Sequence, residues 1–126
     1  MTAAASAAEP TPLEGLFSAI DAMDSEAFAA YMTEDGRFRF GSAPAVVGRQ
    51  AIAEAVAGFF ASIAALSHSV PVFIVEGSTI VCEGETTYTR HDGSDITLPF
   101  ANVFEIDGDK IRDYKIYADL GPLSAA

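Results

Sequence analysis

The sequence predicts an α+β domain in which helices come first and pack across a curved, mainly antiparallel sheet, giving a cone-shaped roll with an internal cavity. Two observations carry this prediction. Apolar residues recur at helical spacing up to residue 67 and at every second position after it, which is typical of strands. The later segments are also separated by dipeptides typical of hairpin turns, namely Glu76-Gly77, Asp92-Gly93 and Asp107-Gly108.

The chain has 126 residues, which is long enough for one domain with a real core and too short for two ordinary ones. We predict a disordered lead-in over residues 1–10 and a single domain over residues 11–126. The opening "MTAAASAAEPTP" has no charged start and no long apolar run, so we do not expect a signal peptide. No apolar run in the sequence reaches membrane-spanning length.

Three helices are expected in the first half of the chain. Thr11 is a candidate N-cap with Pro12 at the first helical position, and Asp24 is a candidate cap for a short second helix, "SEAFAAYM". The third helix follows Gly48. The first helix has an apolar stripe made of Leu13, Leu16, Phe17, Ile20 and Met23. The stripe of the third is made of Ile52, Val56, Phe59, Ile63 and Leu66.

Strands are expected in "RFRF", where Phe38 and Phe40 share one side, and in four longer segments after residue 67. These are "SVPVFIV", "STIVCEGETTYTR", "DITLPFANVFEI" and "DKIRDYKIYADL". In the third of them both faces are apolar, and the row formed by Pro99, Ala101 and Val103 would lie on the outer face of the sheet. Because water should not meet such a row, we expect a homodimer through this outer face.

Charge and composition exclude several classes of function. Eighteen acidic residues against seven basic ones give a formal net charge of −11, so neither nucleic acid nor an anionic membrane surface is an expected partner. Cys82 is the single cysteine, which suits a reducing cytoplasm and reads as a small buried side chain. Two histidines and one cysteine offer no metal-ligand spacing, and no nucleotide-binding motif occurs, so we expect no cofactor.

The order of elements, with "MTEDGRFRF", "VVGRQAI" and "VFEIDGDKI", resembles the nuclear transport factor 2-like superfamily, and within it the SnoaL-like group. The resemblance covers roughly residues 11–120. It implies the cystatin-like cone and a pocket inside it for a small hydrophobic molecule. The superfamily includes ketosteroid isomerases, polyketide cyclases and limonene epoxide hydrolases, together with binding proteins that carry out no chemistry, so the fold does not by itself give the function.

Carrying over the functional residues of this superfamily gives a mixed result. The polyketide cyclases resemble this chain around Asn102 and Ile116, where they carry a histidine and an aspartate, and the second position is apolar here. The catalytic positions of the epoxide hydrolases correspond to Glu83, Glu85 and Ile116. The arginine that orients the epoxide is missing, which argues against that activity.

The same match places Glu83 and Glu85 inside the cone, although the apolar Ile80 and Cys82 lie on the opposite parity of the strand. A bulge near Gly84 would reconcile the two observations, since a glycine within a strand often marks one. The alternative is that both glutamates are solvated or lie at a subunit interface.

The candidate catalytic residues are Glu85, Asn102 and His68. Asn102 lies on an apolar face, where its amide must find a hydrogen-bond partner or meet a ligand. His68 could work near neutral pH or could simply cap the end of a helix. The candidate substrate-binding residues, among which Tyr31 could equally be packing, are Phe17, Tyr31, Phe38, Phe40, Phe59, Glu83, Phe100, Phe104 and Ile116.

Two functions follow from these residues, and the sequence leaves both open. The first is a cofactor-free isomerase, cyclase, dehydratase or hydrolase, in which Glu85 is the acid or base and burial favours its protonated form. The second is a non-catalytic ligand-binding or dimeric assembly module whose pocket is filled by phenylalanines. An open cavity in which Glu85 and Asn102 converge would favour the enzyme.

Overall fold

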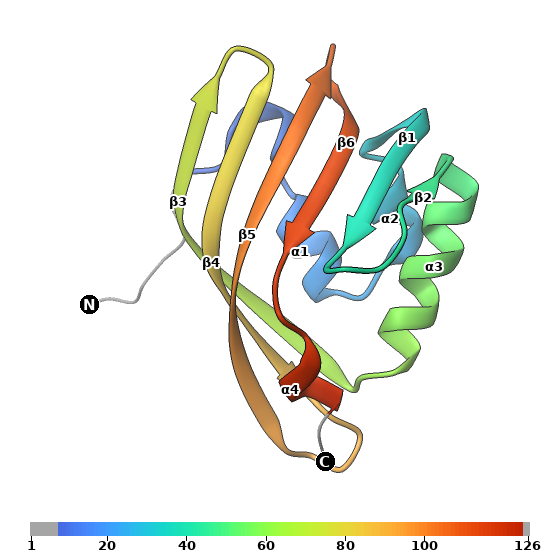
Figure 1. Ribbon diagram of the computed structural model, residues 1–126, viewed down its shortest axis with the longest axis vertical. Coiled ribbons are helices and arrows are strands. Elements are labelled where there is room, and N and C mark those ends of the chain that lie inside the picture. The colour runs from blue at the N-terminus through green and yellow to red at the C-terminus, as the bar shows by residue number, and fades with distance from the viewer. Residues whose placement is uncertain (1–7, 125–126) are drawn as a thin grey trace.

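The computed structural model describes residues 8–124 and confirms the α+β class (Figure 1). Most of the predicted lead-in and the last two residues lie outside the described part. The elements in chain order are a short 3-10 helix η1 (Thr11–Leu13), α1 (Leu16–Asp21), α2 (Ser25–Ala29), β1 (Met32–Phe40), β2 (Val46–Val47), α3 (Arg49–Ala61), β3 (Ala65–Glu76), β4 (Thr79–Thr89), β5 (Asp95–Asp107), β6 (Lys110–Tyr117) and α4 (Gly121–Ser124).

The strands form one six-stranded sheet in the order β2-β1-β6-β5-β4-β3. Strands β3 to β6 are an antiparallel meander, as predicted, and β1 joins its edge by pairing in parallel with β6. The long strands curve, and helices α1 to α3 lie across the concave side (Figure 1). The sheet and the helices therefore enclose a common interior between them.

The turns that connect the long strands agree with the prediction. Gly77, Gly93 and Gly108 each occupy a positive φ, at 60°, 89° and 66°. A residue with a Cβ adopts this region only at a cost, so glycine is the residue that such turns favour. These local signals place all three chain reversals of the meander.

All three predicted helices differ from the structure in their boundaries. The first is interrupted at Gly15, whose φ of 81° is left-handed, and its N-cap position is Pro10 rather than Thr11. The second, "SEAFAAYM", ends at Ala29, and Met32 already belongs to β1. Helix α3 ends at Ala61, so Ile63 lies beyond it and Leu66 already belongs to β3. The predicted cap of the second helix is confirmed, because the Asp24 side chain accepts a hydrogen bond from the Ala27 N–H at 3.0 Å.

The bulge expected near Gly84 is present, but it lies in β3 rather than in β4. Ser69 pairs with Glu85 and Val72 with Glu83, so two residues of β3 stand opposite Gly84 alone. Strand β4 pairs with β5 from end to end without any shift in register. The alternation of β4 is therefore unbroken.

This regular alternation settles the orientation of the two strand glutamates. The residues of β4 that face the interior are buried, and they are Ile80, Cys82, Gly84, Thr86 and Tyr88. Glu83 and Glu85 lie on the other parity and are exposed on the outer face of the sheet. The expectation that these glutamates face the pocket is wrong, because the extra residue that would have reversed their parity belongs to the neighbouring strand.

Candidate active-site cavity

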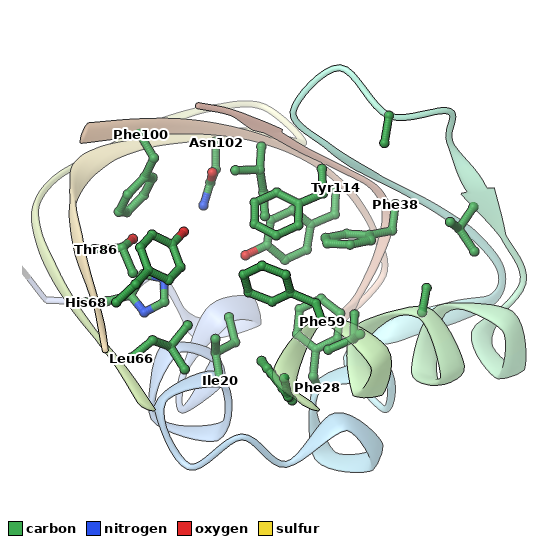
Figure 2. Close-up of a pocket in the computed structure, with 18 of the residues that line it drawn as sticks. Ile20, Phe28, Phe38, Phe59, Leu66, His68, Thr86, Phe100, Asn102 and Tyr114 are labelled. Atoms are coloured by element: carbon green, nitrogen blue, oxygen red, sulfur yellow. The ribbon is translucent and has the colours of Figure 1, made fainter. Parts of the chain in front are cut away.

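A cavity of about 170 Å³ lies between the concave face of the sheet and the helices. Figure 2 shows its labelled side chains pointing into this space from the strands on one side and the helices on the other. Its wall is largely aromatic, with contributions from Phe28, Phe38, Phe40, Phe59, Phe60, Tyr88, Phe100 and Tyr114. The remaining polar side chains of the wall are His68, Thr86 and Asn102.

His68 is held in the cavity wall by Asp21. Its Nδ1 lies 2.6 Å from Oδ1 of Asp21, and its backbone N–H donates to Oδ2 of the same carboxylate at 3.1 Å. Both carboxylate oxygens thus contact the same residue, which fixes the ring in place. Because a carboxylate only accepts, Nδ1 carries the hydrogen, and in the neutral ring Nε2 is then left as the basic atom.

Burial and aromatic packing hold the imidazole from its other sides. The His68 side chain is 11% exposed, against 30% for Asp21. The ring of Phe17 lies 5.1 Å from the imidazole, and that of Phe100 lies 5.6 Å from it, both measured between centroids. The alternative interpretation of His68 as a helix cap is wrong, since it lies within β3 and its partner is a side chain of α1.

The sequence analysis did not identify Asp21 as a site residue, although the sequence contains a sign that it has a buried partner. It lies four residues after Phe17, so both side chains share one face of α1. Phe17 belongs to the predicted apolar stripe, and a carboxylate that continues such a stripe either points to its edge or has a buried partner. Asp21 and His68 are 47 residues apart, and only the packing of α1 on β3 brings them together.

Asn102 occupies the centre of β5, where it pairs with Cys82 on one side and Ile116 on the other. It is 2% exposed, and its side-chain oxygen has no hydrogen-bond partner among the residues that the structure describes. The amide also forms a hydrogen bond with the Cys82 thiol, although burial dominates there and raises the pKa of Cys82 to about 12. Asn102 therefore leaves an unused acceptor, and Cys82 is the buried thiol that was predicted.

Two tyrosines, Tyr88 and Tyr114, also line the cavity and carry hydroxyl groups. Burial raises the pKa of Tyr88, an effect that a side-chain hydrogen bond with Thr86 partly offsets. Burial also raises the pKa of Tyr114 well above its usual value. Both phenols therefore stay protonated near neutral pH and can donate hydrogen bonds. Tyr88 had a signal in the sequence, because it lies on the same face of β4 as Ile80, Cys82 and Thr86.

The structure places the predicted site residues in two groups. Those that line the cavity are Phe38, Phe40, Phe59, His68, Phe100, Asn102 and Ile116. The others do not line it. Phe17 packs against the ring of His68, and Phe104 is fully buried against Tyr114.

The remaining predicted residues are Tyr31 and the two glutamates. The Tyr31 hydroxyl donates to the backbone oxygen of Glu14, away from the cavity. Glu83 and Glu85 are on the opposite face of the sheet. Glu85 and Asn102 therefore do not converge, which removes this reason to favour the enzyme. His68 is the predicted acid–base residue that lines the cavity together with Asn102.

Neither a metal-binding cluster nor a membrane span is found in the described part of the chain. Within residues 8–124, no three histidine, cysteine or acidic side chains lie close enough together to hold a metal ion. No helix in that range is long and apolar enough to cross a membrane.

The two histidines are expected to adopt opposite neutral tautomers. Nδ1 of His68 faces a carboxylate, whereas Nε2 of His91 lies 2.9 Å from the carbonyl oxygen of Ala61 and donates to it. Ring ¹⁵N chemical shifts, recorded at a pH where both rings are neutral, should show the hydrogen on Nδ1 in His68 and on Nε2 in His91. In Asp21→Ala only the His68 pattern should change. An Nε2-protonated His68 in the wild-type protein would contradict the arrangement.

Comparison with known proteins agrees with this architecture. The SnoaL-like domain family matches residues 13–114, and the chain belongs to that family. No curated protein matches the chain in sequence.

Solved structures show the same fold at low sequence identity. A hypothetical protein from Catenulispora acidiphila with a ketosteroid isomerase-like fold, solved in complex with trimethylamine, superposes with a TM-score of 0.83 at 16% identity, over 90% of this chain and 88% of that one. A putative polyketide cyclase from Xanthomonas campestris gives a TM-score of 0.81 at 19% identity, over 90% and 92% of the two chains. An epoxide hydrolase of the limonene type from M. tuberculosis gives 0.74 at 15% identity, over 86% and 80%.

Proposed function

We propose that this protein is a cofactor-independent acid–base enzyme that moves a proton on a small hydrophobic molecule. The observation that carries the proposal is the His68–Asp21 pair in the wall of an apolar cavity. His68 is the base, acting through Nε2, and Asp21 is a positioning residue that holds the ring and its tautomer. Glu85 has no part in this proposal, because it lies on the outer face.

The proposed step is removal of a proton from a carbon next to a carbonyl group. Nε2 takes the proton, the C–H electron pair moves into the C–C bond, and the carbonyl oxygen gains the negative charge. Asp21 stabilises the imidazolium that forms. The proton then returns to a carbon, which gives isomerisation, or a neighbouring hydroxyl leaves with a proton as water, which gives dehydration.

The cavity wall suits the oxygen on which charge develops. The hydroxyls of Tyr88 and Tyr114 are the protonated donors of the wall, and hydrogen bonds to a developing oxyanion are worth more in a dry site than in water. The aromatic side chains also exclude water from the base. These features favour a proton transfer that needs no charged partner other than Asp21.

The experiment is hydrogen–deuterium exchange on a panel of cyclic ketones and enones in D₂O, followed by NMR. We expect the wild-type protein to exchange protons next to the carbonyl of at least one member faster than buffer alone. Binding of the panel is measured separately by calorimetry. Binding without exchange above the buffer rate would contradict the acid–base function.

The second candidate function is a ligand-binding module without chemistry. It is favoured by Ile116, an apolar residue in the cavity wall at the position where polyketide cyclases of the group carry an aspartate. The Catenulispora protein, solved with trimethylamine, shows that a protein of this fold can be found with a small bound molecule. In the exchange experiment, this module is the outcome in which members of the panel bind and do not react.

We also propose that the outer face of the sheet docks a second copy of the chain. One row of paired residues crosses this face from Ile74 through Val81 and Val103 to Lys115. Ile74 is 58% exposed, so this row meets solvent in the monomer. On either side of β5, this face carries the acidic Glu83 and Glu85 on β4 and, on β6, the basic Lys115 with the acidic Asp113 two residues before it.

Lys115 offers a partner for an acidic residue of a second copy. A two-fold axis that runs along β5, between the two sheets, would place β4 of one protomer opposite β6 of the other. Glu83 would then lie near Lys115 of the second copy, and the apolar rows would cover one another. In this arrangement Glu83 and Glu85 would contribute to the dimer interface on the outer face.

Val103→Asp is expected to convert a dimer into a monomer, because it places a charge in the middle of the covered row. Sedimentation velocity at micromolar concentration should show a dimer for the wild-type chain and a monomer for the variant. Ala57→Asp, on the exposed side of α3, is the control and should remain dimeric. A monomeric wild-type chain would refute the dimer, and equal behaviour of both variants would refute docking through this face.

A further inference from the structure

The size of the cavity limits what can enter it. Its volume of about 170 Å³ is close to that of an engineered cavity of about 150 Å³ that binds benzene. A ring system of one ring, or of two fused rings at the upper limit, fits such a space. A molecule of three or four fused rings would require the wall to move.

The charges of the wall limit the ligand further. Among the described residues that line the cavity, none is a lysine or an arginine, so a carboxylate or phosphate would have no cationic partner there. His68 is the one lining residue that can become positive, and its charge would already be matched by Asp21. An anion would therefore lose its hydration without compensation, whereas a neutral molecule would not.

The unpaired oxygen of Asn102 then specifies a functional group. It is a buried acceptor, and within residues 8–124 nothing donates to it. The amide nitrogen reaches further into the cavity than the oxygen does (Figure 2), so a ligand would meet the oxygen after the amide turns about its Cβ–Cγ bond. A buried acceptor without a partner is unfavourable, and a ligand O–H or N–H would provide one. A ketone or ether oxygen could not, since it accepts hydrogen bonds and does not donate them.

We infer that the cavity selects a neutral compound of one or two rings that carries a hydroxyl or N–H group, with this donor directed to the side-chain oxygen of Asn102. Asn102 is then a specificity-determining residue. The inference rests on the proposed function in one respect, because it describes the substrate class of the same cavity. A hydroxyl on Asn102 would fix the ring in one orientation relative to Nε2 of His68.

The test compares the binding of 2-naphthol, naphthalene and 2-naphthoate at neutral pH. The chain contains no tryptophan, so the emission of the naphthalene ring can be followed without tryptophan background. We expect 2-naphthol to bind at least ten times more tightly than either of the other two. Equal binding of naphthalene and 2-naphthol would overturn the role of Asn102, and tight binding of 2-naphthoate would overturn the selection for neutral ligands.

Asn102→Leu keeps the approximate shape of the side chain and removes the acceptor. The preference for 2-naphthol over naphthalene should fall to about one, while naphthalene still binds. Glu85→Gln, on the outer face, is the matched control and should retain the preference. A preference that survives in Asn102→Leu would refute the inference.

A measurement on the wild-type protein covers the case in which Asn102→Leu does not fold. The side-chain ¹³C=O signal of Asn102 should shift when 2-naphthol is added and should shift much less with naphthalene. Equal shifts would refute the inference. None of these measurements involves turnover. Selective binding without proton exchange would therefore refute the acid–base function alone, and exchange with unselective binding would refute this inference alone.

Discussion

Replacing His68 with glutamine is expected to lower the proton-exchange rate of the best substrate by a factor of about 10² to 10⁴, which is the usual contribution of a positioned acid or base. Glutamine can still form a hydrogen bond with Asp21, but it cannot take a proton. The loss should appear in kcat, with a small change in KM, because His68 acts in the reaction step and the aromatic wall supplies most of the binding.

Two further variants make this prediction specific. Asp21→Asn keeps the shape of the carboxylate and removes its charge, so it should lower kcat by less than His68→Gln does. Glu85→Gln should leave the rate unchanged, since its side chain is exposed on the outer face. If Glu85→Gln lowered the rate and His68→Gln did not, the proposed assignment of the base would be wrong.

Replacing Gly84 with alanine is expected to destabilise the domain by about 2–3 kcal/mol or more, which is the upper range for overpacking a well-packed interior. A Cβ at this position would lie 2.0 Å from the Ser69 carbonyl oxygen and 3.0 Å from the Cα of Val70. Both atoms belong to the backbone of the bulge in β3, so no side chain can rotate away. Urea unfolding followed by circular dichroism measures the effect.

Gly58→Ala is the matched control for this variant. Gly58 lies within α3, and a Cβ there would meet no atom within 4 Å. Alanine is favoured over glycine in a helix by about 1 kcal/mol, so this substitution should stabilise the protein. A Gly84→Ala variant that unfolds at the same urea concentration as the wild type would show that the β3 bulge does not press against β4.

The parity of β4 shows how a local pattern and a distant resemblance can disagree. Ile80, Cys82, Thr86 and Tyr88 already indicated which face is buried, and the structure agrees with them. The match to the catalytic positions of other families predicted the reverse for Glu85. The bulge that would have reconciled the two predictions exists, but which strand carries it depends on strand pairing rather than on either strand alone.

The site was only partly predictable for a related reason. Asn102 was found because a polar side chain on an apolar face needs a partner, and this rule operates within a single segment. His68 was found from its residue type, because an imidazole can act near neutral pH. Asp21 was not found, because nothing near it in the sequence shows that its partner is 47 residues away. Tyr31 was misplaced because its hydroxyl reaches back to Glu14, a contact set by the turn between the first helices.

The fold class, the meander and its turns could be predicted from the residues alone, since periodicity and positive-φ glycines act over a few residues and need no tertiary context. The single buried thiol and the aromatic wall also followed from the pattern of apolar residues. Which acid–base group lies in the cavity depends instead on contacts between elements that are distant in the sequence. Packing α1 on β3 joins Asp21 to His68, and the regular pairing of β4 with β5 turns Glu85 outward. Such contacts depend on where separate elements meet in space, which the residues of one element alone do not specify.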